Sequence, residues 1–245
     1  MEWYPGARGR ELRRGPTRPI QGQPIHGHRH GSRCAAACVA VGIGLALVAT
    51  TGPAAAHPHV WVTMQSELVY AADGSVSGIR QAWAFDDMYS AFATQGLKAK
   101  KPGTFTRDEL APLATENVSS LKEFDYFTFA KFDGNKVLFG DPVDYWAEYK
   151  NSILTLHFTL PVKQPFKARA VELEIYDPTY FVDFGFAKTD PLVLKNAPAD
   201  CQLTVKKPTE EEADTRIRSL GEAAFVSGDT NYGAMFANKV WVKCP

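Results

Sequence analysis

Alternation between apolar and polar residues dominates the chain after residue 58. Side chains of an extended strand point alternately to the two faces of a sheet, so this period of two predicts half-buried strands. Segments with the pattern are 59–70, 79–86, 143–150, 152–160, 170–178, 180–186, 201–207 and 240–244. Asp73-Gly74 and Asp133-Gly134 are turn signals, the second inside a further hairpin at 125–140. Most strands are therefore expected to pair as antiparallel neighbours.

Helical periodicity occurs in a few segments. The segment 88–97 follows Asp86-Asp87, and Thr106 with Glu109 forms a capping box that opens a second helix towards Leu121. Further helical patterns cover 210–225 and 232–237. Together the patterns predict an α+β fold, predominantly antiparallel β with sandwich-like sheets and several packed helices. A two-sheet sandwich of subdomains is the alternative.

The first 56 residues differ in composition from the rest. Seven arginines lie in this segment against two acids, and an uncharged apolar run at 34–50 ends before Ala54-Ala55-Ala56. A basic lead, an apolar run and a small-residue site are typical of a cleaved signal peptide. We therefore expect 1–56 to be a signal peptide with a long basic n-region and 57–245 to be a single exported domain. An uncleaved membrane anchor is the alternative, with a run at the short end of the spanning range.

Charge and cysteine content agree with an exported protein that binds no nucleic acid. Residues 57–245 hold 20 basic and 25 acidic side chains, with no basic stripe interleaved with aromatics. Cys201 and Cys244 are the two cysteines of this region, and an even pair in an exported chain predicts a disulfide. We expect a periplasmic location and no membrane span after cleavage.

Histidines at the predicted cleavage site suggest a metal-binding terminus. Cleavage after Ala56 would make His57 the first residue, with a free α-amine beside its imidazole. Both groups deprotonate near neutral pH, so both are able to ligate a metal. On an extended strand His57, His59 and Trp61 share a face. Nitrogen-rich sites of this kind suit nickel, cobalt, copper or zinc.

Pro58 restricts how such a terminus binds a metal. Proline has no amide proton, so the square-planar chelate built from deprotonated backbone amides is blocked. The remaining arrangement, an amine with two imidazoles, resembles the histidine brace of copper proteins. A solvated strand entrance, with the rings packed on Trp61, is the structural alternative.

Other donors could complete the site. Asp86 and His157 are the candidates that we add to His57 and His59 as metal ligands; Asp87, Glu148, Asp177 and Asp183 are further acids of interest. Each has a structural alternative. One or both of Asp86 and Asp87 are expected to cap the following helix, Asp177-Pro178 is a turn signal, and His157 is typical of a core or interface histidine.

Several motifs in fixed order resemble one family. They are HPHVWV at 57–62, WAFDDMYS at 83–90, YWAEYKNSILTLHFTLP at 145–161 and YDPTYFVDF at 176–184. The set is similar to the exported bacterial DUF1007 family, often described as the periplasmic component of an uncharacterised ABC-type transport system. The resemblance covers nearly all of 57–245. Association of family members with nickel/cobalt-type permeases implies a metal-handling role for His57 and His59.

Two functional hypotheses follow. The first is an exported periplasmic protein that binds or delivers nickel, cobalt, copper or zinc as an accessory to an inner-membrane metal permease or ABC-type transporter. The second is a metal-free interaction module that docks on a transport complex. No nucleophile elbow, P-loop or dinucleotide fingerprint occurs in the sequence, so we expect no enzymatic activity.

Overall fold

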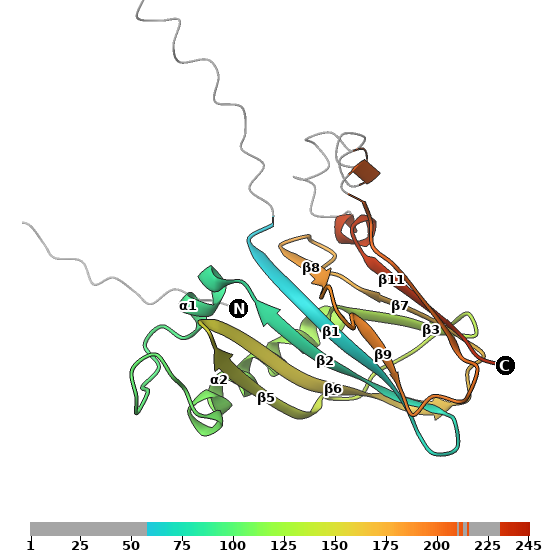
Figure 1. Cartoon of the computed structure of the whole chain (residues 1–245), viewed down its shortest axis with the longest axis horizontal. Coiled ribbons are helices and arrows are strands. Elements are labelled where there is room, and N and C mark those ends of the chain that lie inside the picture. Colours follow the sequence, from blue (N-terminus) through green and yellow to red (C-terminus); the bar gives the residue numbers. More distant parts are fainter. Residues whose placement is uncertain (1–57, 210, 213–214, 216–230) are drawn as a thin grey trace, which may run out of the picture. The chain divides into compact units, whose positions relative to one another are not determined.

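Eleven strands in the described part of the chain form two sheets (Figure 1). The computed structural model describes all residues except 1–57, 210, 213–214 and 216–230. One sheet has the order β5-β6-β2-β1-β8, and β9 also pairs with β1. Its strands are β1 (Val60–Tyr70), β2 (Val76–Phe85), β5 (Val143–Lys150), β6 (Ile153–Phe166), β8 (Val182–Phe186) and β9 (Leu192–Lys195).

The second sheet is assembled from the middle and the end of the chain. Its order is β10-β11-β7-β3-β4. Its strands are β3 (Thr128–Phe132), β4 (Asn135–Lys136), β7 (Ala170–Ile175), β10 (Gln202–Lys206) and β11 (Asn238–Lys243). All its pairings are antiparallel, whereas β8 and β9 lie parallel to β1 in the first sheet. The prediction of a predominantly antiparallel fold is confirmed.

The predicted alternation along β1 is present in the structure. Val60, Val62 and Met64 are buried, while Trp61 and Thr63 are exposed. In β2, Trp83 pairs with Met64 and meets Phe158 and Phe184 edge to face, each with ring centroids 4.8 Å apart. One face of this sheet therefore lies on the core, and the other, called here the outer face, carries the residues that alternate with it.

The two sheets share one hydrophobic core. Phe132 of β3 packs on Phe166 of β6 with ring centroids 5.5 Å apart. Polar contacts also cross between the sheets: the buried amide of Gln81 donates to Thr128 Oγ1 at 3.4 Å, and Asn238 Nδ2 donates to the Phe184 carbonyl. Such a two-layer arrangement buries the apolar face of each sheet against the other.

Helices contribute less than expected. The described residues contain two α-helices, α1 (Asp87–Ala93) and α2 (Arg107–Ser120), and two 3₁₀ segments, η1 (Leu121–Phe127) and η2 (Tyr232–Met235). The prediction of several packed helices is not supported. At 232–237 the structure has a single 3₁₀ turn, and the pattern at 210–225 lies largely outside the described residues. No helix among those described is long and apolar enough to span a membrane.

Local signals at the helix starts and at the chain end are confirmed. Asp86 caps α1, because its carboxylate accepts the Tyr89 N–H at 2.8 Å. The capping box of Thr106 and Glu109 is complete. Cys201 and Cys244 form the predicted disulfide, beside the last residue pair of β10 and β11.

Candidate functional site

His59 lies at the entrance of β1, on the outer face of the first sheet. Its backbone N–H donates to the Phe181 carbonyl at 2.9 Å, and its ring lies 4.8 Å from the Phe181 ring, centroid to centroid. The side chain is exposed. The strand is therefore fixed against the start of β8 from residue 59 onwards. His57, the other half of the predicted pair, lies outside the described residues.

Asp86 lies opposite Trp61, next to the β1 entrance. The Trp61 N–H donates to its Oδ2 at 2.9 Å, and the Tyr89 N–H donates to its Oδ1. Each carboxylate oxygen thus already accepts one backbone N–H, which fixes the side chain while leaving lone pairs on both atoms. The capping role expected of this residue is present, and a further ligand would have to bind through those lone pairs.

His157 of β6 lies elsewhere on the same outer face. It pairs with Ala82 of β2, four residues before Asp86. At ~3.3 Å per residue, His157 is therefore separated from Asp86 by about 13 Å along the strand direction. One ion cannot be shared over that distance, because ligand atoms lie within ~2–2.5 Å of a metal. The structure therefore brings Asp86 to the β1 entrance but does not bring His157 there.

The surroundings of His157 are aromatic and charged. Its ring stacks on Trp146, with centroids 3.9 Å apart and planes 5° from parallel, and its Nε2 lies 3.3 Å from Glu148 Oε1. The Arg107 guanidinium lies over the same Trp146 ring, 4.2 Å from its centroid. Burial lowers the pKa of His157, and the Glu148 carboxylate opposes that shift. This environment favours a neutral, stacked imidazole rather than a charged one.

The remaining acids of interest have structural surroundings of their own. Asp177 makes the expected turn, since its carboxylate accepts the backbone N–H groups of Thr179 and Val182 at 2.8 and 3.0 Å. Asp183 pairs with Trp61 on the opposite side from Asp86, and burial raises the pKa of its carboxyl. Within the part of the chain that the structure describes, no group of three His, Cys, Asp or Glu residues is placed to hold a metal ion.

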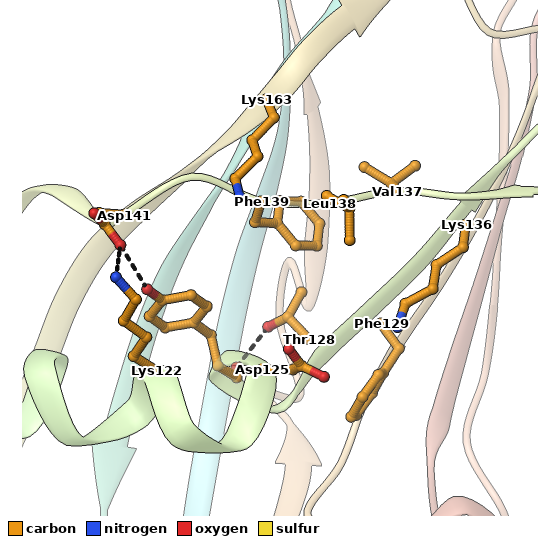
Figure 2. Close-up of a pocket in the computed structure, with 11 residues that line it drawn as sticks. Lys122, Asp125, Thr128, Phe129, Lys136, Val137, Leu138, Phe139, Asp141 and Lys163 are labelled. Atoms are coloured by element: carbon orange, nitrogen blue, oxygen red, sulfur yellow. Dashed lines mark hydrogen bonds and ion pairs between the residues drawn. The ribbon is translucent and has the colours of Figure 1, made fainter.

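A cavity of about 310 Å³, which the sequence patterns did not indicate, lies where the two sheets meet (Figure 2). Three lysines enter it from separate elements: Lys122 from η1, Lys136 from β4 and Lys163 from β6. These residues are far apart in the sequence and belong to no motif. Only the tertiary arrangement of η1, β4 and β6 places them around one cavity, so no local signal could have identified it.

The charges around this cavity are partly compensated. Lys122 Nζ lies 2.7 Å from Asp141 Oδ1, which the Tyr126 hydroxyl also approaches at 3.4 Å. Lys122 accordingly holds the pKa of the Asp141 carboxyl below its usual value, and burial raises the pKa of the Tyr126 phenol. Asp125 also lines the cavity. Neither Lys136 nor Lys163 has a salt bridge or a side-chain hydrogen bond among the described residues.

A strained turn forms one wall of the cavity. Asp125, Tyr126 and Phe127 have φ of 50°, 54° and 48°, the left-handed region that L residues other than Asn and Asp rarely adopt. Such conformations cost about 1–3 kcal/mol each and persist only where surrounding contacts impose them. Here the Thr128 hydroxyl donates to the Tyr126 carbonyl at 2.8 Å, and the Tyr176 N–H donates to the Phe127 carbonyl at 3.0 Å.

Comparison with known proteins gives the family. Residues 42–244 match the family described as "Protein of unknown function (DUF1007)". An uncharacterized protein of Haemophilus influenzae is 23% identical over 193 residues, covering 77% of this chain and 91% of that protein. An uncharacterized 15.5 kDa protein in the trpE 3′ region of Spirochaeta aurantia is 29% identical over 94 residues, covering 38% of this chain and 67% of that protein. The chain belongs to the DUF1007 family.

Proposed function

We propose that this protein is exported to the periplasm and that its mature N-terminus binds a first-row transition metal, which it holds for or delivers to an inner-membrane metal permease or ABC-type transporter. Nickel, cobalt, copper and zinc all suit the nitrogen donors concerned. The proposed donors are the α-amine and imidazole of His57 and the imidazole of His59.

The position of His59 supports the proposal most strongly. Its ring is exposed at the entrance of β1, and its backbone is hydrogen-bonded to Phe181. Two residues of chain span at most about 7 Å, so a terminus at His57 would stay within that distance of the fixed backbone of His59. Such a short tether costs little entropy to order, which favours chelation by donors from both histidines.

Carboxylates near the β1 entrance could complete the coordination shell. Asp86 is one candidate because it pairs with Trp61, two residues after His59, and keeps unused lone pairs. Asp183 pairs with Trp61 from the other side, and its partly buried carboxyl would gain from a neighbouring cation, because a positive charge offsets the cost of ionising it. His157 belongs to a different part of the outer face, so we assign it no part in this shell.

Calorimetric titration with each of the four metals tests the proposal. Protein with His57 as its first residue should bind one ion, and His57→Ala and His59→Ala should each weaken binding by at least roughly tenfold, since even outer-shell partners of a ligand contribute 10–100-fold. His157→Ala is the matched control and should bind as the parent does. Unchanged affinity in both terminal variants would refute the proposal.

A glycine inserted before His57 separates the two possible binding modes. The insertion keeps both imidazoles but moves the amine by one residue, so a chelate that uses the amine should weaken while simple binding to two imidazoles should not. An unchanged affinity would remove the amine from the proposed site.

A metal-free docking role is the second candidate, and one observation favours it. The end of the sheet where β1 begins and β2 ends carries exposed apolar side chains: Trp61, Met88, Phe92 and Phe181, between 47% and 73% exposed. A cluster of this kind is typical of an interaction surface. A double variant, Met88→Ser with Phe92→Ser, should then abolish co-purification of a membrane transporter without changing metal affinity. Co-purification that survives the double variant would exclude this surface.

A further inference from the structure

The cavity between the sheets has walls fixed by backbone hydrogen bonds. The connection from β4 to β5 crosses it, and its Val137 N–H donates to the Ala130 carbonyl of β3 at 3.0 Å. Three residues on, the Gly140 N–H donates to the Pro161 carbonyl of β6 at 2.7 Å, and the backbone N–H of Lys163 donates to the Leu138 carbonyl at 3.0 Å. One short segment is thus bonded to both sheets. A cavity with such walls is preformed, as small-molecule sites commonly are.

The charge of the cavity favours a monoanion. Asp141 is matched by Lys122 at 2.7 Å, which leaves Lys136 and Lys163 against the single carboxylate of Asp125. The surplus is one positive charge. A doubly charged phosphate would exceed that surplus and would meet repulsion from Asp125, whereas one carboxylate would balance it.

The lining also provides apolar surface. Phe129, Leu138 and Phe139 border the cavity, and Leu138 is 59% exposed although it is a large aliphatic residue. Lys136, Leu138 and Lys163 also border a neighbouring cavity of about 220 Å³. At about 310 Å³ the main cavity is at the small end of the range for ligand sites, about 300–1,000 Å³.

The strained turn is a second, independent feature of the same place. Three consecutive left-handed residues, none of them glycine, form the wall that carries Asp125 and Tyr126. Strain of this kind is concentrated at ligand clamps and active sites, where it holds side chains in positions that a relaxed backbone would not give.

We propose that this cavity binds a small carboxylic acid with an apolar body. Lys163 binds the carboxylate, and Lys136, on the other side of Leu138 and Phe139, adds to the positive potential of the cavity (Figure 2). Phe129, Leu138 and Phe139 pack against the body. Lys122, Asp141 and Tyr126 form a neutral polar wall, and Asp125 disfavours ligands of higher charge. The site uses none of the proposed metal donors, so it stands or fails independently of the metal proposal.

Titration followed by ¹H–¹⁵N NMR tests the proposal, with the metal-free chain expressed in full and benzoate as the probe. Saturable shifts should be confined to amides of 125–129, 136–141 and Lys163. Benzamide has the shape of benzoate without the charge, and inorganic phosphate has charge without the apolar body. The affinity of each should be lower than that of benzoate by roughly tenfold or more. Phosphate binding as tight as that of benzoate would overturn the proposal.

Paired lysine variants show whether benzoate binds in this cavity. Lys136→Gln with Lys163→Gln should weaken benzoate binding roughly tenfold or more, as loss of a hydrogen bond to a charged group predicts. The control, Lys150→Gln with Lys195→Gln, removes the same charge from exposed sites and should leave binding unchanged. Equal effects of the two pairs, or no saturable shift with either benzoate or hexanoate in the parent, would refute the site.

Discussion

Removal of the disulfide provides a prediction whose size follows from the structure. Cys201 and Cys244 are 43 residues apart, and the bond between them lies beside the pair Gln202–Lys243 at the end of β10 and β11. Strand β10 is an edge strand, and Leu203 in it is 37% exposed. Few apolar contacts therefore hold this strand besides its hydrogen bonds to β11.

The expected loss is large for a domain of this size. In the chain-entropy model, closing a loop of this length stabilises the native state by about 4 kcal/mol. Folded domains are stable by only about 5–15 kcal/mol, so the double variant Cys201→Ser with Cys244→Ser should lose a substantial share. Its hydroxyls add no apolar contact that would offset the loss.

Urea unfolding at equilibrium, followed by far-UV circular dichroism, measures the change. The double variant should unfold with a free energy about 4 kcal/mol lower than that of the oxidised parent, and the reduced parent should match the variant. Amide exchange should rise first in β10. A loss below about 1 kcal/mol would show that the unfolded chain is already constrained, and would refute the reasoning.

Three further predictions concern single residues. Ser90→Ala should cost about 1–3 kcal/mol in urea unfolding, because Ser90 Oγ accepts the buried Leu154 N–H at 2.9 Å; an unchanged midpoint would contradict this. Gly233→Ala should lower the melting temperature, since a Cβ there would lie 1.6 Å from the Asp177 carbonyl oxygen; unchanged melting would contradict this. The NMR titration of His157 should have its midpoint below pH 6.5, because burial lowers its pKa in the folded chain. The unfolded chain then takes up the proton first as the pH drops through 6.5, so the free energy of unfolding should fall there; a titration midpoint above pH 6.5 would contradict this.

Local patterns predicted local structure well. Alternation from Val60 to Met64 predicted which face of β1 is buried, and Thr106 with Glu109 predicted the start of α2. Asp133 and Gly134 predicted the hairpin between β3 and β4, where both residues have positive φ. These features depend on side chains within a few residues of each other, so a sequence reading is sufficient for them.

Features that depend on long-range pairing were not predicted. Strands β8 and β9 lie parallel to β1, and β9 was not expected as a strand. The left-handed turn at 125–127 contains no glycine that would have indicated it. The three lysines of the cavity are 14 and 27 residues apart along the chain, and only the tertiary fold places η1, β4 and β6 around one cavity.

The candidate metal site was predictable only in part. Sequence suggested His57, His59, Asp86 and His157 as one set of donors, but register separates His157 from Asp86 by about 13 Å along the sheet. The cap formed by Asp86 was foreseen, whereas the stacking of His157 on Trp146 was not, because Trp146 lies on a neighbouring strand whose register the sequence does not reveal.

Native mass spectrometry of the protein expressed from the whole sequence and sought in the periplasmic fraction tests the central claim most directly. It reports the first residue and any bound ion in one measurement. We predict a chain that begins at His57 and carries one transition-metal ion, which is absent from the His57→Ala protein prepared in the same way. A chain that begins elsewhere, or one that begins at His57 and takes up no nickel, cobalt, copper or zinc when these are supplied, would contradict the claim.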